Sequence, residues 1–176
     1  MNRTVILHRR IREMVIFAML GTLMFCAKLV FEALPNVHPI ALLIVAYTVV
    51  YRVKALIPIY IFVIITGIYA GFALWWIPYL YIWAVLWAFT MLLPKRLPHK
   101  VAVFVYPALC ALHGVAYGIL YAPAQMVLYF NADFSKMWQW ILAGLPYDLI
   151  HMFGNFAAGT LVFPLVLLLR RLEKIR

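Results

Sequence analysis

The chain has 176 residues, of which 68% are hydrophobic and 11% charged, and its formal net charge at pH 7 is +10. Soluble domains carry about 25% charged residues, so this composition excludes that class and predicts an all-α integral membrane protein with room for about six spans. The chain contains no GxxxxGK[ST] phosphate-binding loop, and its two cysteines lie in apolar runs without disulfide or metal-ligand spacing. We therefore expect no cofactor and no metal, and any use of ATP would need a partner.

The first predicted span is 14–34, which follows an arginine-rich start. This run has spanning length and no clean small-x-small cleavage site, so we interpret it as an uncleaved helix rather than a signal peptide. Ala18, Thr22 and Cys26 form a small-xxx-small stripe along which another helix can approach closely. Nearer the end of the span, Lys28 and Glu32 are one turn apart; we expect a self-compensating ion pair there, with a ligand contact as the alternative.

A segment with two prolines, 35–39, separates this helix from the next, because neither proline suits a helix interior. The next three predicted spans are 40–51, 55–72 and 77–93. The first of these is short, so we expect it to be tilted or recessed. In the next one, Gly67 and Gly71 form a GxxxG pair that predicts a tightly packed face.

The fifth predicted span, 101–128, carries polar and aromatic side chains on one face. They recur every four residues, as His113, Tyr117, Tyr121 and Gln125. The segment 129–146 reads as an amphipathic connection, and its two tryptophans are typical of anchors at the membrane interface.

The sixth predicted span, 147–169, follows Pro146, which suits the first turn of a helix. Its first half carries Asp148, His151 and Asn155 on one helical face. Polar groups at membrane depth are costly and normally face the protein interior, so this face is a candidate functional site. The alternatives are a polar seam between helices and simple exposure at the interface.

The positions of lysine and arginine predict the orientation of the chain. Four precede Met14, two lie between the second and third spans, three between the fourth and fifth, and four follow Leu169. The loops at the opposite ends of the spans contain only Lys136. The positive-inside rule then places both termini in the cytoplasm, and the charge is a topology signal rather than a nucleic-acid patch.

The same orientation brings polar and aromatic side chains from several helices to the outer side. Convergence of this kind predicts a small-molecule pocket, and the many rings favour a flat, vitamin-sized substrate. The candidate substrate-binding residues are Asn36, His38, Trp75, Trp76, Tyr79, Trp83, Tyr117, Tyr121, Gln125, Tyr147, Asp148, His151 and Asn155.

Two other functions remain open at this point. An intramembrane enzyme would use His113, His151 and Asp148, and a pure assembly subunit would bind no ligand. Binding of a molecule that is returned unchanged would distinguish the first predicted function from both.

The chain resembles a substrate-binding (S) component of an energy-coupling factor (ECF) vitamin transporter. The resemblance rests on the small six-span format, on the first-helix stripe, and above all on the segment GLPYDLIHMFGN at 144–155 followed by a basic tail. Thr22 and Cys26 depart from the alanines that are usual in that stripe. The resemblance implies a non-enzymatic subunit in a prokaryotic cell membrane that captures a micronutrient from outside, between the outer ends of helices four to six and the loops. It also implies that Ala18, Thr22 and Cys26 dock on a membrane coupling subunit driven by two ATPases.

Overall fold

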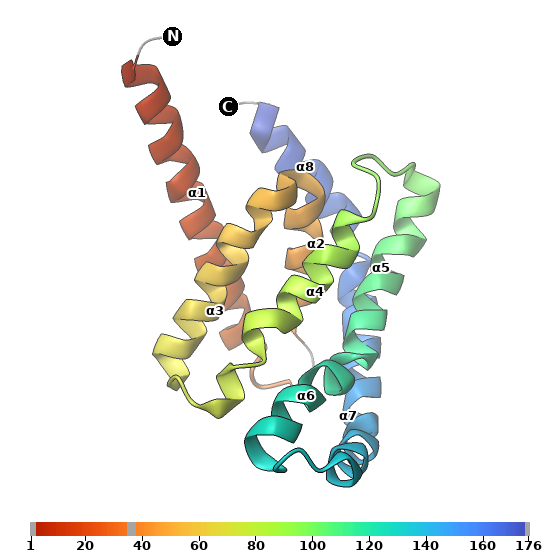
Figure 1. Cartoon of the computed structure of the whole chain (residues 1–176). Helices are drawn as coiled ribbons and strands as arrows, with labels where there is room; N and C mark the ends of the chain where they lie inside the picture. Colours follow the sequence, from red (N-terminus) through yellow and green to blue (C-terminus); the bar gives the residue numbers. More distant parts are fainter. Residues whose placement is uncertain (1–2, 35–37, 175–176) are drawn as a thin grey trace.

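The computed structural model describes residues 3–34 and 38–174, and every regular element in these ranges is a helix (Figure 1). The helices, with 3₁₀-helices labelled η, are α1 (Arg3–Val30), α2 (Ile40–Tyr51), η1 (Arg52–Ala55), α3 (Leu56–Ala70), η2 (Leu74–Trp76), α4 (Tyr79–Met91), α5 (His99–Val115), α6 (Tyr117–Tyr129), α7 (Phe134–Gly159) and α8 (Val162–Lys174). The predicted all-α class is therefore confirmed.

Several of these helices have the length and apolar composition needed to cross a bilayer. Within the described residues there are four such stretches: Ile6–Val30, Ile40–Ala70, Leu74–Met91 and His99–Tyr129. Helices α7 and α8 make a fifth if this pair, bent by 45°, counts as one span. Many large apolar side chains on these helices are exposed, as expected for a surface that contacts lipid rather than water.

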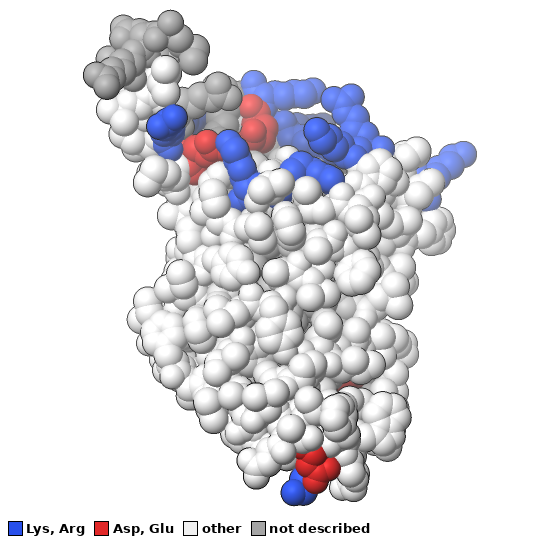
Figure 2. Space-filling view, in the orientation of Figure 1, with Lys and Arg blue, Asp and Glu red and all other residues white. Residues whose placement is uncertain are grey.

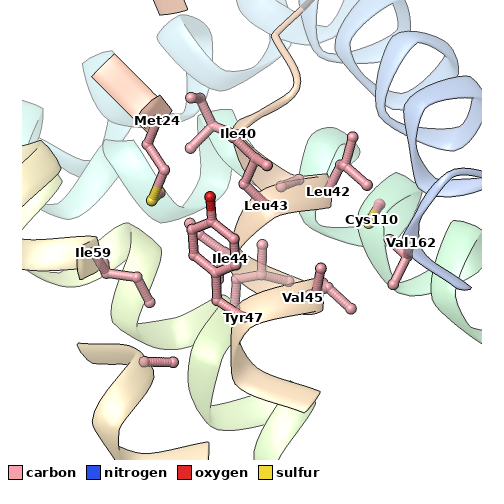
Figure 3. Close-up of a cluster of buried hydrophobic side chains, with 14 of the residues drawn as sticks. Met24, Ile40, Leu42, Leu43, Ile44, Val45, Tyr47, Ile59, Cys110 and Val162 are labelled. Carbon is pink, nitrogen blue, oxygen red and sulfur yellow. The ribbon is translucent and has the colours of Figure 1, made fainter. Parts of the chain in front are cut away.

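Helix α2 forms the centre of the core. Its residues from Ile40 to Val49 are all buried, and Figure 3 shows them surrounded by side chains from other helices. Among the surrounding residues are Met24, Ile59, Cys110 and Val162. A helix that is apolar on every side is stable only when it is enclosed, which explains why so short a segment occupies the middle of the molecule.

Between α2 and α3 the chain reverses direction at Arg52 (Figure 1). Arg52 has φ 56°, a left-handed conformation that is uncommon for a residue with a Cβ atom. Its guanidinium donates hydrogen bonds to the carbonyls of Met91 (2.6 Å) and Leu93 (3.2 Å), which hold the turn against the end of α4. The reversal places Ile40 and Phe62 on the wall of one cavity.

The predicted tight packing at the GxxxG pair on α3 is confirmed for Gly67, which is buried, but is wrong for Gly71. Gly67 packs against the rings of Phe72 and Trp76 from the following turn, not against another helix. Gly71 ends α3 at φ +88°, with nothing within 4 Å of the place where a Cβ atom would lie. Its role is to end the helix in a conformation that glycine adopts at little cost.

Close packing of one helix against another occurs between α5 and α7. A Cβ atom at Gly114 would lie 2.9 Å from the backbone of His151, and one at Gly159 would lie 2.7 Å from the Cα atom of Pro107. The two helices approach so closely because neither glycine has a side chain. This contact fixes the position of His151 along α5.

Helix α7 is longer than the sequence predicted. It begins at Phe134, and Pro146 lies inside it instead of in its first turn. Asp133 is the N-cap, since its carboxylate accepts hydrogen bonds from the backbone N–H groups of Ser135 (2.9 Å) and Lys136 (3.2 Å). The bond from the Lys136 N–H is the main cause that lowers the pKa of Asp133.

The predicted single helix over 147–169 is interrupted. Helix α7 ends at Gly159, and α8 starts at Val162 after a bend of 45°. Pro164 explains the interruption, because its ring clashes with the carbonyl four residues earlier and it has no N–H to donate to that carbonyl.

Basic side chains gather at one end of the molecule, which we call the basic end. Figure 2 shows lysine and arginine concentrated where Figure 1 places both termini, above a middle without charge. Contacts at this end join Arg52 to the last turn of α4, Lys54 to Glu13, and Arg170 to the Lys95 carbonyl. A smaller charged group lies at the opposite end.

Candidate functional site

A cavity of about 180 Å³ lies among the helices. Six helices line it, α1, α2, α3, α4, α6 and α7, together with His38 just before α2. The lining residues are Lys28, His38, Ile40, Ala41, Phe62, Tyr79, Trp83, Tyr117 and His151. A cavity of about 150 Å³ accommodates a benzene ring, whereas drug-sized ligands need about 300 Å³ or more. The volume therefore suits one aromatic ring with a small substituent.

Tyr117 is the centre of the cavity wall. Its ring centroid lies 5.0 Å from that of His151, 5.9 Å from that of Tyr121 and 6.0 Å from that of Trp83. Rings at these separations with inclined planes are favourable aromatic pairs, so the wall is held in place before any ligand enters.

His38 brings an imidazole to the cavity from the segment before α2. Its ring centroid lies 6.3 Å from that of His151, with the planes at 72°. Burial is the main cause that lowers the pKa of His38; the nearby Lys28 ammonium lowers it further, and Glu32 acts in the opposite direction. His38 is therefore neutral near pH 7, and a neutral imidazole both donates and accepts a hydrogen bond.

Lys28 also faces this cavity, from the last turn of α1. The ion pair with Glu32 that the spacing predicted is not formed among the described residues. Lys28 is half-buried and Glu32 is exposed. The ammonium thus adds a positive charge to an otherwise aromatic wall.

A second, more open hollow of about 430 Å³ lies between α6 and the first half of α7. It is lined by Tyr117, Gly118, Tyr121, Trp140, Ala143, Gly144, Tyr147 and Asp148. The rings of Tyr121 and Trp140 stack across it with centroids 6.0 Å apart and planes at 26°. Tyr117 separates this hollow from the first cavity, since it lines both.

The predicted site residues fall into several groups in the structure. Five of them line the first cavity: His38, Tyr79, Trp83, Tyr117 and His151. Three others line the second hollow: Tyr121, Tyr147 and Asp148. Neither is lined by Trp75, Trp76, Gln125 or Asn155. Trp76 instead donates to the Val63 carbonyl (2.9 Å), and the Trp75 carbonyl accepts from the Tyr121 hydroxyl. Asn36 lies outside the described residues.

Sequence reasoning missed several lining residues. Ile40, Ala41 and Phe62 carry no polar signal, and they reach the cavity only because the chain reverses at Arg52. Trp140 was interpreted as an interface anchor. It precedes Gly144 and Asp148 by one and two helical turns, so a helix drawn through Pro146 would have placed it on the same face as Asp148.

Of the three residues of the alternative enzyme, His113 and His151 both lie beside the ring of Tyr117, with ring centroids 6.3 Å and 5.0 Å from it. The Nε2 atom of His113 lies 3.2 Å from the Ile82 carbonyl, while an oxygen of Asp148 accepts a hydrogen bond from the Gly118 N–H. His151 packs against Tyr117. Among the residues that the structure describes, no three His, Cys, Asp or Glu side chains are grouped so that they could hold a metal ion.

Comparisons of the chain with known protein families, with characterised proteins and with solved structures find no match.

Proposed function

We propose that the chain is the substrate-capture subunit of an ATP-driven importer of the energy-coupling factor type, in a prokaryotic cell membrane. It takes up a vitamin-like small molecule on the outer side and delivers it through a membrane coupling subunit with two ATPases. The observation that carries the proposal is the aromatic cavity of about 180 Å³, enclosed by side chains from most of the helices. A pre-formed ring-lined cavity with a few polar groups is typical of a small-molecule site.

The position of the cavity supports capture from outside. The cavity residues of α4, Tyr79 and Trp83, lie in its first half, whereas the end of α4 contacts Arg52 at the basic end. The cavity also takes residues from the last turn of α1 and the first turn of α2, which are again remote from the basic end. With the basic end in the cytoplasm, as the positive-inside rule predicts, the cavity lies in the outer half of the molecule.

The outward face of α1 supports docking on a partner. Ala18, Thr22 and Cys26 are exposed, while Phe17, Gly21 and Met24 on the opposite side of the helix are buried. The Thr22 hydroxyl donates to the Ala18 carbonyl (2.9 Å), so its polar group is already satisfied within the helix. A stripe of small side chains without unmet hydrogen bonds suits close packing against a second membrane helix.

Two measurements test the proposal. Mass spectrometry of small molecules that co-purify with the protein should find one compound bound one-to-one and chemically unchanged. Uptake of this compound by cells should require ATP and the coupling subunits. A bound compound converted to a product would favour the enzyme, and absence of any ligand would favour an assembly subunit.

Orientation has its own test. In intact cells, a membrane-impermeant thiol reagent should label cysteines introduced at Asn131 or Asp133, and should miss those introduced at Arg96 or Lys174. The reverse pattern would place the cavity in the cytoplasmic half and refute capture from outside.

A further inference from the structure

The cavity combines aromatic walls with one cationic side chain. Phe62, Trp83 and Tyr117 supply ring faces and edges from three different helices. Trp83 lies 5.9 Å from Phe62 and 6.0 Å from Tyr117 between ring centroids, so the three form one continuous surface. A flat ring gains most from such a surface, because it contacts faces and edges together.

Lys28 is the unusual member of this wall. It is half-buried on a helix that carries no other charged side chain over 14–30, and in the ranges 3–34 and 38–174 no acidic side chain pairs with it. A lysine ammonium at membrane depth is costly unless an anion neutralises it, and lysine acts as a compact point charge that attracts carboxylate or phosphate.

The other titratable groups around the cavity do not supply that anion. His38 and His151 offer imidazoles, and Tyr79 and Tyr117 offer hydroxyls. Asp148 lies in the second hollow and is bound to the Gly118 N–H, while Glu32 is exposed. The lining therefore presents a positive charge beside neutral groups that can form hydrogen bonds.

We propose that this cavity binds a single-ring aromatic carboxylate, whose ring packs among Phe62, Trp83 and Tyr117 and whose carboxylate pairs with the Lys28 ammonium. The volume of about 180 Å³ sets the limit of one ring with a small substituent. His38 and His151 bind polar atoms at the ring edge. This assignment names the substrate class of the proposed function and rests on it for its biological role, but binding can be measured without any partner subunit.

The test uses matched acids and amides with the full-length protein in nanodiscs of neutral phosphatidylcholine. Benzoate and benzamide form one pair, and nicotinate and nicotinamide the other; each pair has nearly the same shape and differs in charge. Calorimetric titration should show the acid of at least one pair binding about 10- to 100-fold more tightly than its amide, the range for a hydrogen bond to a charged group. Lys28→Met should abolish this preference, and Lys28→Arg should retain it.

Lys136→Met is the matched control, because it removes a lysine at the start of α7 that lines neither cavity. It should leave the preference unchanged, and thermal melts should show all variants folded. Equal binding of acids and amides, a preference that survives Lys28→Met, or no binding of any of the four compounds would overturn the assignment. So would loss of the preference in wild-type protein when phosphatidylglycerol is added, because Lys28 would then bind a lipid phosphate.

Failure of this inference and failure of the proposed function give different results. Acid-selective binding without ATP-dependent uptake would refute transport and leave the assignment of the cavity intact. ATP-dependent uptake of a neutral or multi-ring compound, with no acid-selective binding, would refute the assignment alone.

Discussion

The carboxylate of Asp148 on α7 accepts a hydrogen bond from the backbone N–H of Gly118 on α6, with 3.2 Å between oxygen and nitrogen. Gly118 is in the first turn of α6, just after the helical stretch is interrupted at Ala116, where backbone N–H groups lose their partners within the helix. Asp148 thus caps α6 from a neighbouring helix. A Cβ atom at Gly118 would overlap this carboxylate, so the contact also depends on glycine.

This contact predicts different effects of two substitutions at Asp148. Asp148→Ala should lower the free energy of unfolding by about 1–2 kcal/mol, the usual effect of losing a helix cap. Asp148→Asn should be nearly neutral, because the amide oxygen can accept the same hydrogen bond. Chemical unfolding in detergent measures both. An equal loss in the two variants would show that the charge, and not the acceptor, stabilises the protein.

Two glycines allow a matched test of packing between α5 and α7. Gly114→Ala should lower the free energy of unfolding by about 1–3 kcal/mol, because its Cβ atom would lie 2.9 Å from the backbone of His151 and the helices must separate. Gly144→Ala adds the same atom on α7 where nothing lies within 4 Å. This control should be neutral or stabilising by up to about 1 kcal/mol, since alanine favours helices. Similar losses in both would refute the packing argument.

The helical fold and the presence of helices apolar enough to cross a membrane could be predicted, because they follow from composition and from long apolar runs. The interruption at Ala116 could not. Near Ala116 the chain has no proline. The residue that accepts the hydrogen bond of the Gly118 N–H after this break is Asp148, thirty positions beyond Gly118 and on another helix. Pro146 misled in the opposite direction, because α7 already begins at the Asp133 cap, well before Pro146, and the helix continues through the proline.

Prediction of the site had a similar limit. The four-residue spacing placed Tyr117 and Tyr121 on one face, and the structure joins their rings at 5.9 Å. Phe62 could not be assigned, because its place on the cavity wall depends on the turn at Arg52. For Lys28 the spacing favoured the ion pair with Glu32 over a ligand contact, because the packing of α1 against α3 cannot be predicted from one helix. The spacing of residues along one helix predicts which side chains share a face, but it does not predict which neighbouring helix that face contacts.

Asn155 carries a buried amide that lowers stability. Its side chain is 1% exposed, and neither amide atom has a hydrogen-bond partner among the described residues. Such a group costs about 1–3 kcal/mol of desolvation. Asn155→Leu, which has a similar branched shape, should therefore raise the melting temperature, whereas Asn155→Asp should lower it by burying a charge. A lower melting temperature for the leucine variant would show that the amide has a partner in solution.

The outward stripe on α1 yields the test of docking. Ala18→Trp adds a large side chain at an exposed position, so the fold and ligand binding should be unchanged. If the stripe docks on the coupling subunit as proposed, uptake driven by ATP should be lost, because the added volume would separate the two membrane helices. The matched control is Ala108→Trp at an exposed position of α5, outside the stripe, which should transport normally. In pull-down experiments, Ala18→Trp should fail to bind the coupling subunit and Ala108→Trp should bind it. If Ala18→Trp transported as well as Ala108→Trp, this face of α1 would contact lipid and the docking surface would lie elsewhere.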